Sequence, residues 1–154
     1  MALHRIEELS PADPAATICL ARYYAELDAR FSGGFMVEQS ADPDAADLIR
    51  PRGCFLVAFA GDQPVGCIAL KGTDRGYAEI KRMWIAKQAR GSGLARHLMA
   101  RIETVARELG ITLLRLDSNR ALHEAIAIYR HWGWTEVTRF NDDPYADVFF
   151  EKAI

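Results

Sequence analysis

The sequence predicts a single mixed α+β domain in which a central, mostly antiparallel sheet of about seven strands is flanked by four helices. Three observations predict this class. Apolar residues switch between helical spacing and short strand-like runs along the chain. No internal repeat, low-complexity stretch or linker divides residues 1–154. A chain of this length buries about 68–70% of the surface that it exposes when unfolded, which suffices for one full core.

The first third of the chain predicts one strand and two helices. Residues 2–9 are expected to form the strand. A helix over residues 10–30 follows, with Ser10 as its N-cap and Pro11 in its first turn, and the glycines at 33 and 34 end it. Residues 41–49 predict a short second helix, which Pro51 and Gly53 end.

Three strands come next, because two apolar runs flank a Gly-Asp-Gln turn and a third run follows a glycine-rich turn. They are expected at residues 54–60, 64–71 and 77–85. Leucine, isoleucine and valine then recur at spacings of three and four between residues 94 and 109, which predicts a helix over 91–109 that Gly110 ends. The last expected elements are a strand at 111–116, a helix at 121–132 and two closing strands at 134–139 and 146–152.

Charge and composition exclude several classes of protein. The chain has 19 Lys and Arg against 21 Asp and Glu, a net charge of -2, which argues against a nucleic-acid partner. No apolar run reaches the roughly 20 residues of a membrane span, and the N-terminus does not read as a signal peptide. We therefore expect a cytoplasmic protein with no membrane partner.

The cysteines and histidines predict no metal site. The cysteines lie apart among apolar neighbours, which predicts buried, reduced thiols. The histidines share no metal-ligand spacing, so each is expected at the surface or on a helix flank, and no metal is expected. The residues are Cys19, Cys54, Cys67, His4, His97, His123 and His131.

The most informative segment is EIKRMWIAKQARGSGLA at residues 79–95, where a strand passes through a basic turn into a helix. The first four amides of a helix lack intrahelical partners, and the helix dipole adds about half a positive charge, so phosphate or pyrophosphate can bind there. A plain connection in which the glycines only permit the turn is the alternative. A Walker P-loop string is absent, and a dinucleotide motif would need glycine where Arg96 stands.

Several strings together resemble a known family. QARGSG matches the Q/R-x-x-G-x-G/A pyrophosphate motif of the GNAT superfamily of acyl-CoA N-acetyltransferases, and EAIAIYRHWGW resembles its A-x-x-[LI]-Y-x-x-x-G-[FW] segment. More narrowly, EIKRMWI, LDSN and RFNDDPYA resemble a group of small bacterial GNAT proteins. The resemblance spans the chain and implies a GNAT-like fold whose fourth and fifth strands splay apart beside a bulge. It also implies an N-acetyltransferase that uses acetyl-CoA.

The resemblance implies a cofactor site built mainly from main-chain groups. The backbone at residues 83–85 would bind pantetheine, and the amides at 90–95 would hold the pyrophosphate. Trp84 itself is expected to pack rather than to react. The implied cofactor residues are Met83, Trp84, Ile85, Gln88, Arg90, Gly91, Ser92, Gly93, Leu94, Ala95, Asn119 and Ala125.

Two catalytic residues are implied in the same way. Glu79 would act as the base that helps to deprotonate the amine, through water rather than directly because Lys81 and Arg82 favour its charged form; an exposed strand-end carboxylate is the alternative. Tyr129 would hydrogen bond to, or protonate, the departing thiolate, unless it only continues an apolar stripe. The chain departs from the family pattern at Leu122, where many members have Asn, so Asn119 is expected either to substitute for that contact or to cap the next helix.

The acceptor is expected on the side of the first helices and of the connection between the last two strands. Several cations there suggest a small amine that also bears a carboxylate or phosphate, although solvated surface charge explains them equally well. The expected acceptor residues are Arg30, Phe35, Lys81, Arg82, Asn141 and Tyr145, with Arg139 nearby. Two other functions stay open, a non-catalytic acyl-CoA-binding regulatory domain and a protein-lysine acetyltransferase. The resemblance also implies a homodimer through the last two strands.

Overall fold

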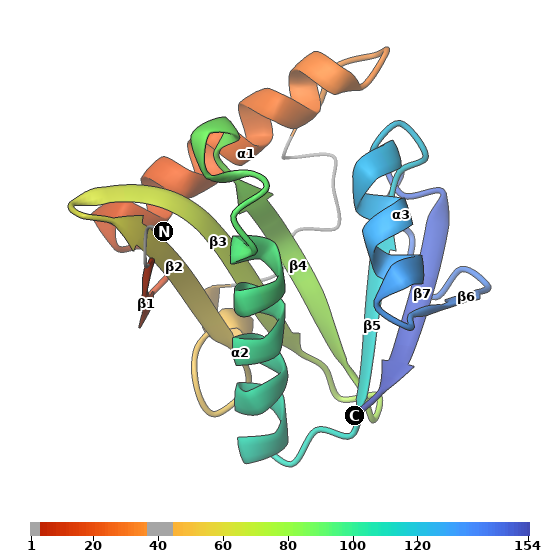
Figure 1. The fold of residues 1–154 in the computed structure, drawn as a ribbon. Coiled ribbons are helices and arrows are strands. Elements are labelled where there is room, and N and C mark those ends of the chain that lie inside the picture. The colour runs from red at the N-terminus through yellow and green to blue at the C-terminus, as the bar shows by residue number, and fades with distance from the viewer. Residues whose placement is uncertain (1–3, 37–44) are drawn as a thin grey trace.

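The computed structural model describes residues 4–36 and 45–154, which form a seven-stranded sheet with three α-helices and two short 3-10 turns in the described residues (Figure 1). The strands are β1 (Arg5–Glu8), β2 (Cys54–Ala60), β3 (Gln63–Gly72), β4 (Ala78–Ile85), β5 (Leu113–Ser118), β6 (Thr135–Val137) and β7 (Val148–Ala153). The helices are α1 (Pro14–Arg30), α2 (Leu94–Glu108) and α3 (His123–His131), and the turns are η2 (Ala45–Leu48) and η3 (Lys87–Ala89).

The sheet has the order β1-β2-β3-β4-β5-β7-β6, and every neighbouring pair is antiparallel except β4 with β5. β4 and β5 run parallel and pair only through Ala78 with Leu114 and Glu79 with Arg115. Beyond these two pairs the strands diverge, as Figure 1 shows. The splayed fourth and fifth strands and the mostly antiparallel sheet are confirmed.

A β-bulge interrupts β4 at the place where the strands separate. Cys67 of β3 faces Trp84, but Ala69 faces Lys81, so Ile68 lies opposite both Arg82 and Met83. Arg82 accommodates the extra residue in the left-handed region, at φ 54°. The regular alternation of side chains between the two faces of the sheet is therefore shifted by one residue at the bulge.

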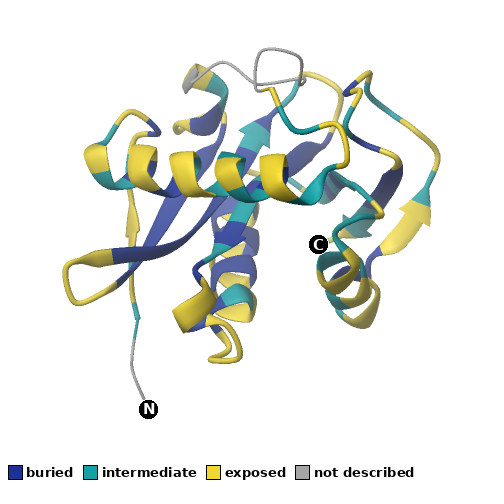
Figure 2. Ribbon diagram, turned by 90° about the horizontal axis from the view of Figure 1, so that it is seen from above, coloured by how far each residue is buried: buried dark blue, intermediate teal, exposed yellow. Residues whose placement is uncertain are grey.

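Helices α1 and α2 both pack against β3 and β4, and the apolar face of α2 is buried as its spacing predicts. The core holds Phe55, Ile68, Leu98, Leu116 and Phe150, each fully buried. Figure 2 shows the central strands as buried, while the edge strands β1 and β6 and the outer face of α1 are largely exposed. All three cysteines are buried and free, as expected.

The N-terminal third differs from the sequence expectation in two ways. The helix predicted at 41–49 is a 3-10 turn over Ala45–Leu48, and residues 41–44 lie outside the described residues, so the described part has three α-helices instead of four. The first helix begins at Pro14 with Asp13 as its N-cap, because the Asp13 Oδ1 atom accepts from the Ala15 amide at 3.0 Å. Ser10 belongs to a preceding turn, where its carbonyl accepts from the Asp13 amide at 2.9 Å.

The other predicted elements are confirmed, with ends shifted by up to a few residues; β5 starts at Leu113 and continues to Ser118, and β6 is only three residues long. Among the described residues, no helix combines the length and the apolar character that crossing a bilayer requires.

Candidate active site

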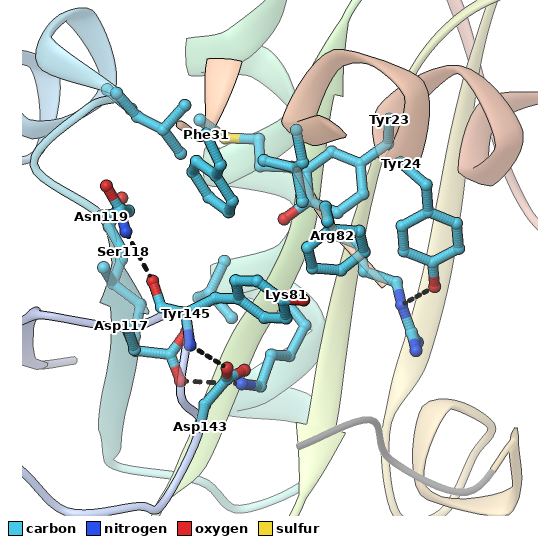
Figure 3. A pocket seen from close by; sticks show the side chains of 18 of the residues that line it. Tyr23, Tyr24, Phe31, Lys81, Arg82, Asp117, Ser118, Asn119, Asp143 and Tyr145 are labelled. Carbon is cyan, nitrogen blue, oxygen red and sulfur yellow. Dashed lines mark hydrogen bonds and ion pairs between the residues drawn. The ribbon is translucent and has the colours of Figure 1, made fainter. Parts of the chain in front are cut away.

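A cavity of about 140 Å³ opens where β4 and β5 separate (Figure 3). Residues of α1, the segment after it, β4, the end of β5, α3 and the β6–β7 connection line it. They include Tyr23, Tyr24, Phe31, Phe35, Lys81, Arg82, Met83, Asp117, Asn119, Leu122, Ala125, Tyr129, Asp143 and Tyr145. Segments far apart in sequence thus meet at the opening of the sheet.

The main chain of β4 beyond Glu79 has an edge that faces the opening. Trp84 and Ile85 pair with β3 on one side, whereas β5 pairs with β4 only as far as Glu79. A strand edge of this kind can hydrogen bond to the amides of an extended ligand. Met83 lines the cavity, while Trp84 is 6% exposed and belongs to the core, so its expected packing role is confirmed.

The QARGSG segment forms a turn whose backbone requires glycine. Gly91 and Gly93 have φ of 79° and 85°, and a Cβ atom at either would meet nothing within 4 Å, so the backbone conformation and not crowding accounts for them. The helical ladder of α2 opens with the His97 amide, which donates to the Gly93 carbonyl at 3.1 Å. The amides at 93–96 precede that ladder and are free of helical partners, as anion binding requires.

Side-chain charge beside this turn is partly neutralised. The Arg90 guanidinium donates to the Ile85 carbonyl at 3.0 Å and to the Glu26 carboxylate of α1 at 2.5 Å. The Arg90 amide donates to the Lys87 carbonyl at 3.3 Å within η3, and the Gln88 side chain is exposed. The helix N-terminus, more than Arg90, is therefore the electropositive part of the turn.

Tyr129 extends from α3 into the cavity. Its ring packs against Trp134 and Phe150 at centroid distances of 6.2 and 6.0 Å, which fixes the hydroxyl in place. Burial, with a smaller contribution from the charge of Asp117, raises the pKa of this hydroxyl. The phenol therefore remains a proton donor at neutral and mildly alkaline pH.

Glu79 is not the exposed strand-end carboxylate that was the alternative, since it is 4% exposed. Its carboxylate lies 3.4 Å from Lys71 Nζ and 3.8 Å from Lys81 Nζ, and it accepts from Asn141 Nδ2 at 3.3 Å. It lies outside the set of residues that line the cavity. Lys81, which does line the cavity, thus connects Glu79 to the opening.

Asp117, at the end of β5, is the carboxylate beside the cavity that sequence reasoning missed. Its Oδ2 atom accepts from Lys81 Nζ at 2.9 Å and from Asn141 Nδ2 at 2.5 Å. Burial opposes the charge on Lys81, but Asp117 and Glu79 outweigh it and raise the pKa of the lysine. The available signal was the position of Asp117 in LDSN, at the carboxyl end of a strand next to the splay.

The cations expected to receive an acidic acceptor all have partners in the protein. Arg30 binds the Glu124 carboxylate at 2.7 Å and does not line the cavity. Arg82 donates to the Tyr24 hydroxyl at 3.0 Å, and Arg139 donates to three carbonyl groups of the β6–β7 connection. Lys81 is paired with Asp117. Arg30 and Lys81 are thus paired with carboxylates, whereas Arg82 and Arg139 bind neutral oxygen atoms.

Asn119 joins two segments of the protein. Its Oδ1 atom accepts from the Ala121 amide at 2.8 Å before α3, and its Nδ2 atom donates to the Tyr145 carbonyl at 2.7 Å. It lines the cavity beside Leu122 and Ala125. Asn119 therefore organises the approach to α3 rather than capping its first residue.

Comparison with known proteins agrees with this geometry. A model of the acetyltransferase (GNAT) family matches residues 20–134. A protein of Azospirillum brasilense named IAA acetyltransferase is 35% identical over 133 residues, which cover 84% of this chain and 86% of that protein.

Solved structures share the fold. An acetyltransferase of the GNAT family from Staphylococcus aureus superimposes with a TM-score of 0.83 at 17% identity, covering 98% of this chain and 99% of that one. The PaiA N-acetyltransferase of Thermoplasma acidophilum, solved in complex with coenzyme A, has a TM-score of 0.71 at 19% identity and covers 99% of both chains.

Proposed function

The chain belongs to the acetyltransferase (GNAT) family and is an acetyl-CoA-dependent N-acetyltransferase, and on that premise we propose that it acetylates the primary amine of a small molecule by direct attack. One domain, residues 1–154, carries the reaction. Acetyl-CoA supplies the activated acetyl group. The remaining chemistry is assigned to the side chains and main-chain groups around the cavity.

The proposed cofactor site uses the two main-chain features of the cleft. The free edge of β4 at Met83, Trp84 and Ile85 pairs with the amides of pantetheine, and the α2 N-terminus receives the pyrophosphate. Amides of residues 91–95 donate to the phosphate oxygens, with Gln88 and Arg90 at the rim. Ala125 and Asn119 line the other side of the thioester.

The acceptor amine must lose a proton before it attacks. An alkylamine has a pKa of about 10.4, so deprotonation at pH 7 costs roughly 4–5 kcal/mol. We assign Glu79 a relayed role, because its carboxylate does not line the cavity whereas Lys81, 3.8 Å from it, does. The proton passes to water at the cavity, and the negative charge of the Glu79 and Asp117 pair favours its departure.

Attack forms the carbon–nitrogen bond and breaks the carbon–sulfur bond, and the electron pair leaves on the sulfur. The Tyr129 hydroxyl donates its proton to that thiolate, and the second proton that the nitrogen loses as the amide forms restores the hydroxyl. A main-chain amide of β4 stabilises the negative charge that develops on the carbonyl oxygen. The observation that carries the proposal is that Tyr129 and the ion pair of Asp117 with Lys81 line one cavity at the open edge of β4.

A small acceptor is favoured over a protein lysine by the enclosure of this cavity. Half-buried aromatic side chains of α1, the segment after it and the β6–β7 connection cover its acceptor side and contact one another. The sequence expectations of a homodimer through β6 and β7 and of a cytoplasmic location belong to this proposal. Sedimentation of the purified protein tests the first.

The test is release of free thiol from acetyl-CoA in the presence of an amine library, with mass measurement of the product. Tyr129→Phe keeps the ring that packs on Trp134 and Phe150, so we expect its thermal unfolding to be unchanged and its kcat to fall about 100-fold. The KM for acetyl-CoA should hardly move. Tight acetyl-CoA binding with no turnover of any amine, before and after the substitution, would favour the regulatory alternative.

A further inference from the structure

The cavity has two walls of opposite character, and their combination indicates a class of acceptor. One wall, the aromatic roof, consists of Tyr24, Phe31, Phe35 and Tyr145. The other, the acidic floor, consists of Asp117 and Asp143 together with Lys81. Figure 3 shows these three side chains together on one side of the cavity.

The aromatic roof is a contiguous set of rings at the cavity. Phe35 lies at its centre, with its ring centroid 4.7 Å from Tyr145, 5.6 Å from Tyr24 and 6.2 Å from Phe31. Phe31 and Tyr145 stack at 5.7 Å. All four side chains are only half-buried, so ring surface faces the cavity. Aromatic faces of this kind pack well against a further ring.

Hydrogen bonds hold the roof in place. The Phe35 amide donates to Asp28 Oδ1 at 2.8 Å, and the Met36 amide donates to the Tyr145 hydroxyl at 2.9 Å. Gly34, at φ 75°, makes this turn, and a Cβ atom there would lie 2.9 Å from the same Asp28 oxygen. The roof therefore joins α1 to the β6–β7 connection before any ligand binds.

The acidic floor brings carboxylates and lysines together. Glu79 contacts Lys71 and Lys81, Asp117 binds Lys81, and the Asp143 charge acts on Lys81 as well, while Arg139 donates to the main-chain carbonyl of Asp143 at 3.2 Å. Asp143 is 9% exposed and its Oδ1 atom accepts from the Tyr145 amide at 2.9 Å. Arg82 lies on the other side of the cavity, bound to Tyr24 (Figure 3).

We propose that the acceptor is an arylalkylamine without an acidic group, whose ring lies against the aromatic roof and whose ammonium group is bound by Asp117. This inference rests on the proposed function. Asp117 and Tyr129 line the same cavity, so an ammonium held at Asp117 shares that cavity with the proton donor for the leaving thiolate. A carboxylate on the acceptor would meet the carboxylates of the acidic floor.

The test compares four amines at saturating acetyl-CoA by thiol release: 2-phenylethylamine, n-butylamine, L-phenylalanine and spermidine. We expect kcat/KM for 2-phenylethylamine to exceed each of the others at least tenfold, which corresponds to about 1.4 kcal/mol. The comparison with L-phenylalanine isolates the carboxylate, and the comparison with n-butylamine isolates the ring.

Variants assign the preference to the two walls. Phe35→Leu should lower the ratio of 2-phenylethylamine to n-butylamine at least fivefold. The matched control is Phe140→Leu, in a separate ring cluster with Tyr77 and Phe149 outside the cavity, which should leave the ratio unchanged. Asp117→Asn should lower kcat/KM for every amine at least 30-fold without changing the half-saturating concentration of acetyl-CoA.

Two outcomes separate this inference from the proposed function. If n-butylamine, spermidine or L-phenylalanine reacts as well as 2-phenylethylamine, or if Phe35→Leu and Phe140→Leu shift the ratio alike, the arylalkylamine inference is wrong and the N-acetyltransferase proposal stands. If no amine releases thiol although acetyl-CoA binds, the proposed function fails, and this inference fails with it.

Discussion

The two ends of the cleft present different kinds of binding group. At the proposed cofactor end, the binding groups are main-chain amides of the α2 N-terminus and the free edge of β4, and the side chains there are small, apolar or exposed. At the proposed acceptor end, the groups are side chains from α1, β4, β5 and the β6–β7 connection, joined by ion pairs and ring contacts.

This difference determines how each end responds to substitution. A main-chain site depends on backbone conformation, so substitutions should weaken binding only at residues that determine a φ angle. A side-chain site depends on partners, so the loss of one member leaves another buried and unpaired. The predictions below test each end by the kind of change to which it should be most sensitive.

The largest effect is expected at the acceptor end, from Lys81→Met. The Lys81 side chain is 10% exposed and that of Asp117 is 12% exposed, so the substitution leaves the buried Asp117 carboxylate without its cation, while Glu79 keeps Lys71. We expect a loss of about 3–5 kcal/mol in the free energy of unfolding, measured with urea.

Lys152→Met is the matched control. Lys152 lies 3.2 Å from Glu103, but its side chain is 28% exposed and Glu103 keeps Arg107 as a second partner. The control should lose less than about 1 kcal/mol. Equal losses in the two variants would mean that the acceptor end does not depend on its buried pair.

An intermediate effect is expected at the cofactor end, from Gly93→Ala. At φ 85°, a residue with a side chain destabilises the turn by about 1–2 kcal/mol. The turn can relieve this strain by leaving the conformation that binds the cofactor. The KM for acetyl-CoA should rise about tenfold, with the KM for the amine unchanged. Gly110→Ala, at φ 79° beyond the other end of α2, carries the same strain and should lower stability without changing either KM.

The smallest effect is expected in the pH dependence of the reaction. Because burial and Asp117 raise the pKa of Tyr129, the proton donor is still present at pH 10, where an ordinary tyrosine would be half ionised. The ratio kcat/KM should therefore rise with pH as the amine loses its proton, with no descending limb up to pH 10. A descending limb centred below pH 10 that disappears in Tyr129→Phe would contradict this assignment.

Local sequence patterns were sufficient for the turn and helix of the proposed cofactor end and insufficient for the side-chain contacts of the proposed acceptor end. The glycines of QARGSG and the apolar spacing of 94–109 act within a few residues, so the turn and α2 were predicted correctly. Sequence spacing could not predict that Glu79 is buried, or that Asp117 and Asn141 lie beside Lys81, because both depend on the order of strands in the sheet. The misplaced N-cap at Ser10 reflects competition between two capping residues three positions apart.

The bulge at Arg82 makes the length of β4 as important as its composition. Residues 79 and 81 belong to the acceptor side and residues 83–85 to the cofactor side. The extra residue of the bulge determines how the side chains of the two groups are oriented relative to each other. Deleting Arg82 would remove the bulge and leave Lys81 opposite Ala69 and Trp84 opposite Cys67, whereas a deletion within residues 78–80 would turn the residues on one side of it to the opposite face. We therefore expect the deletion of Arg82 to be tolerated better than a deletion within residues 78–80.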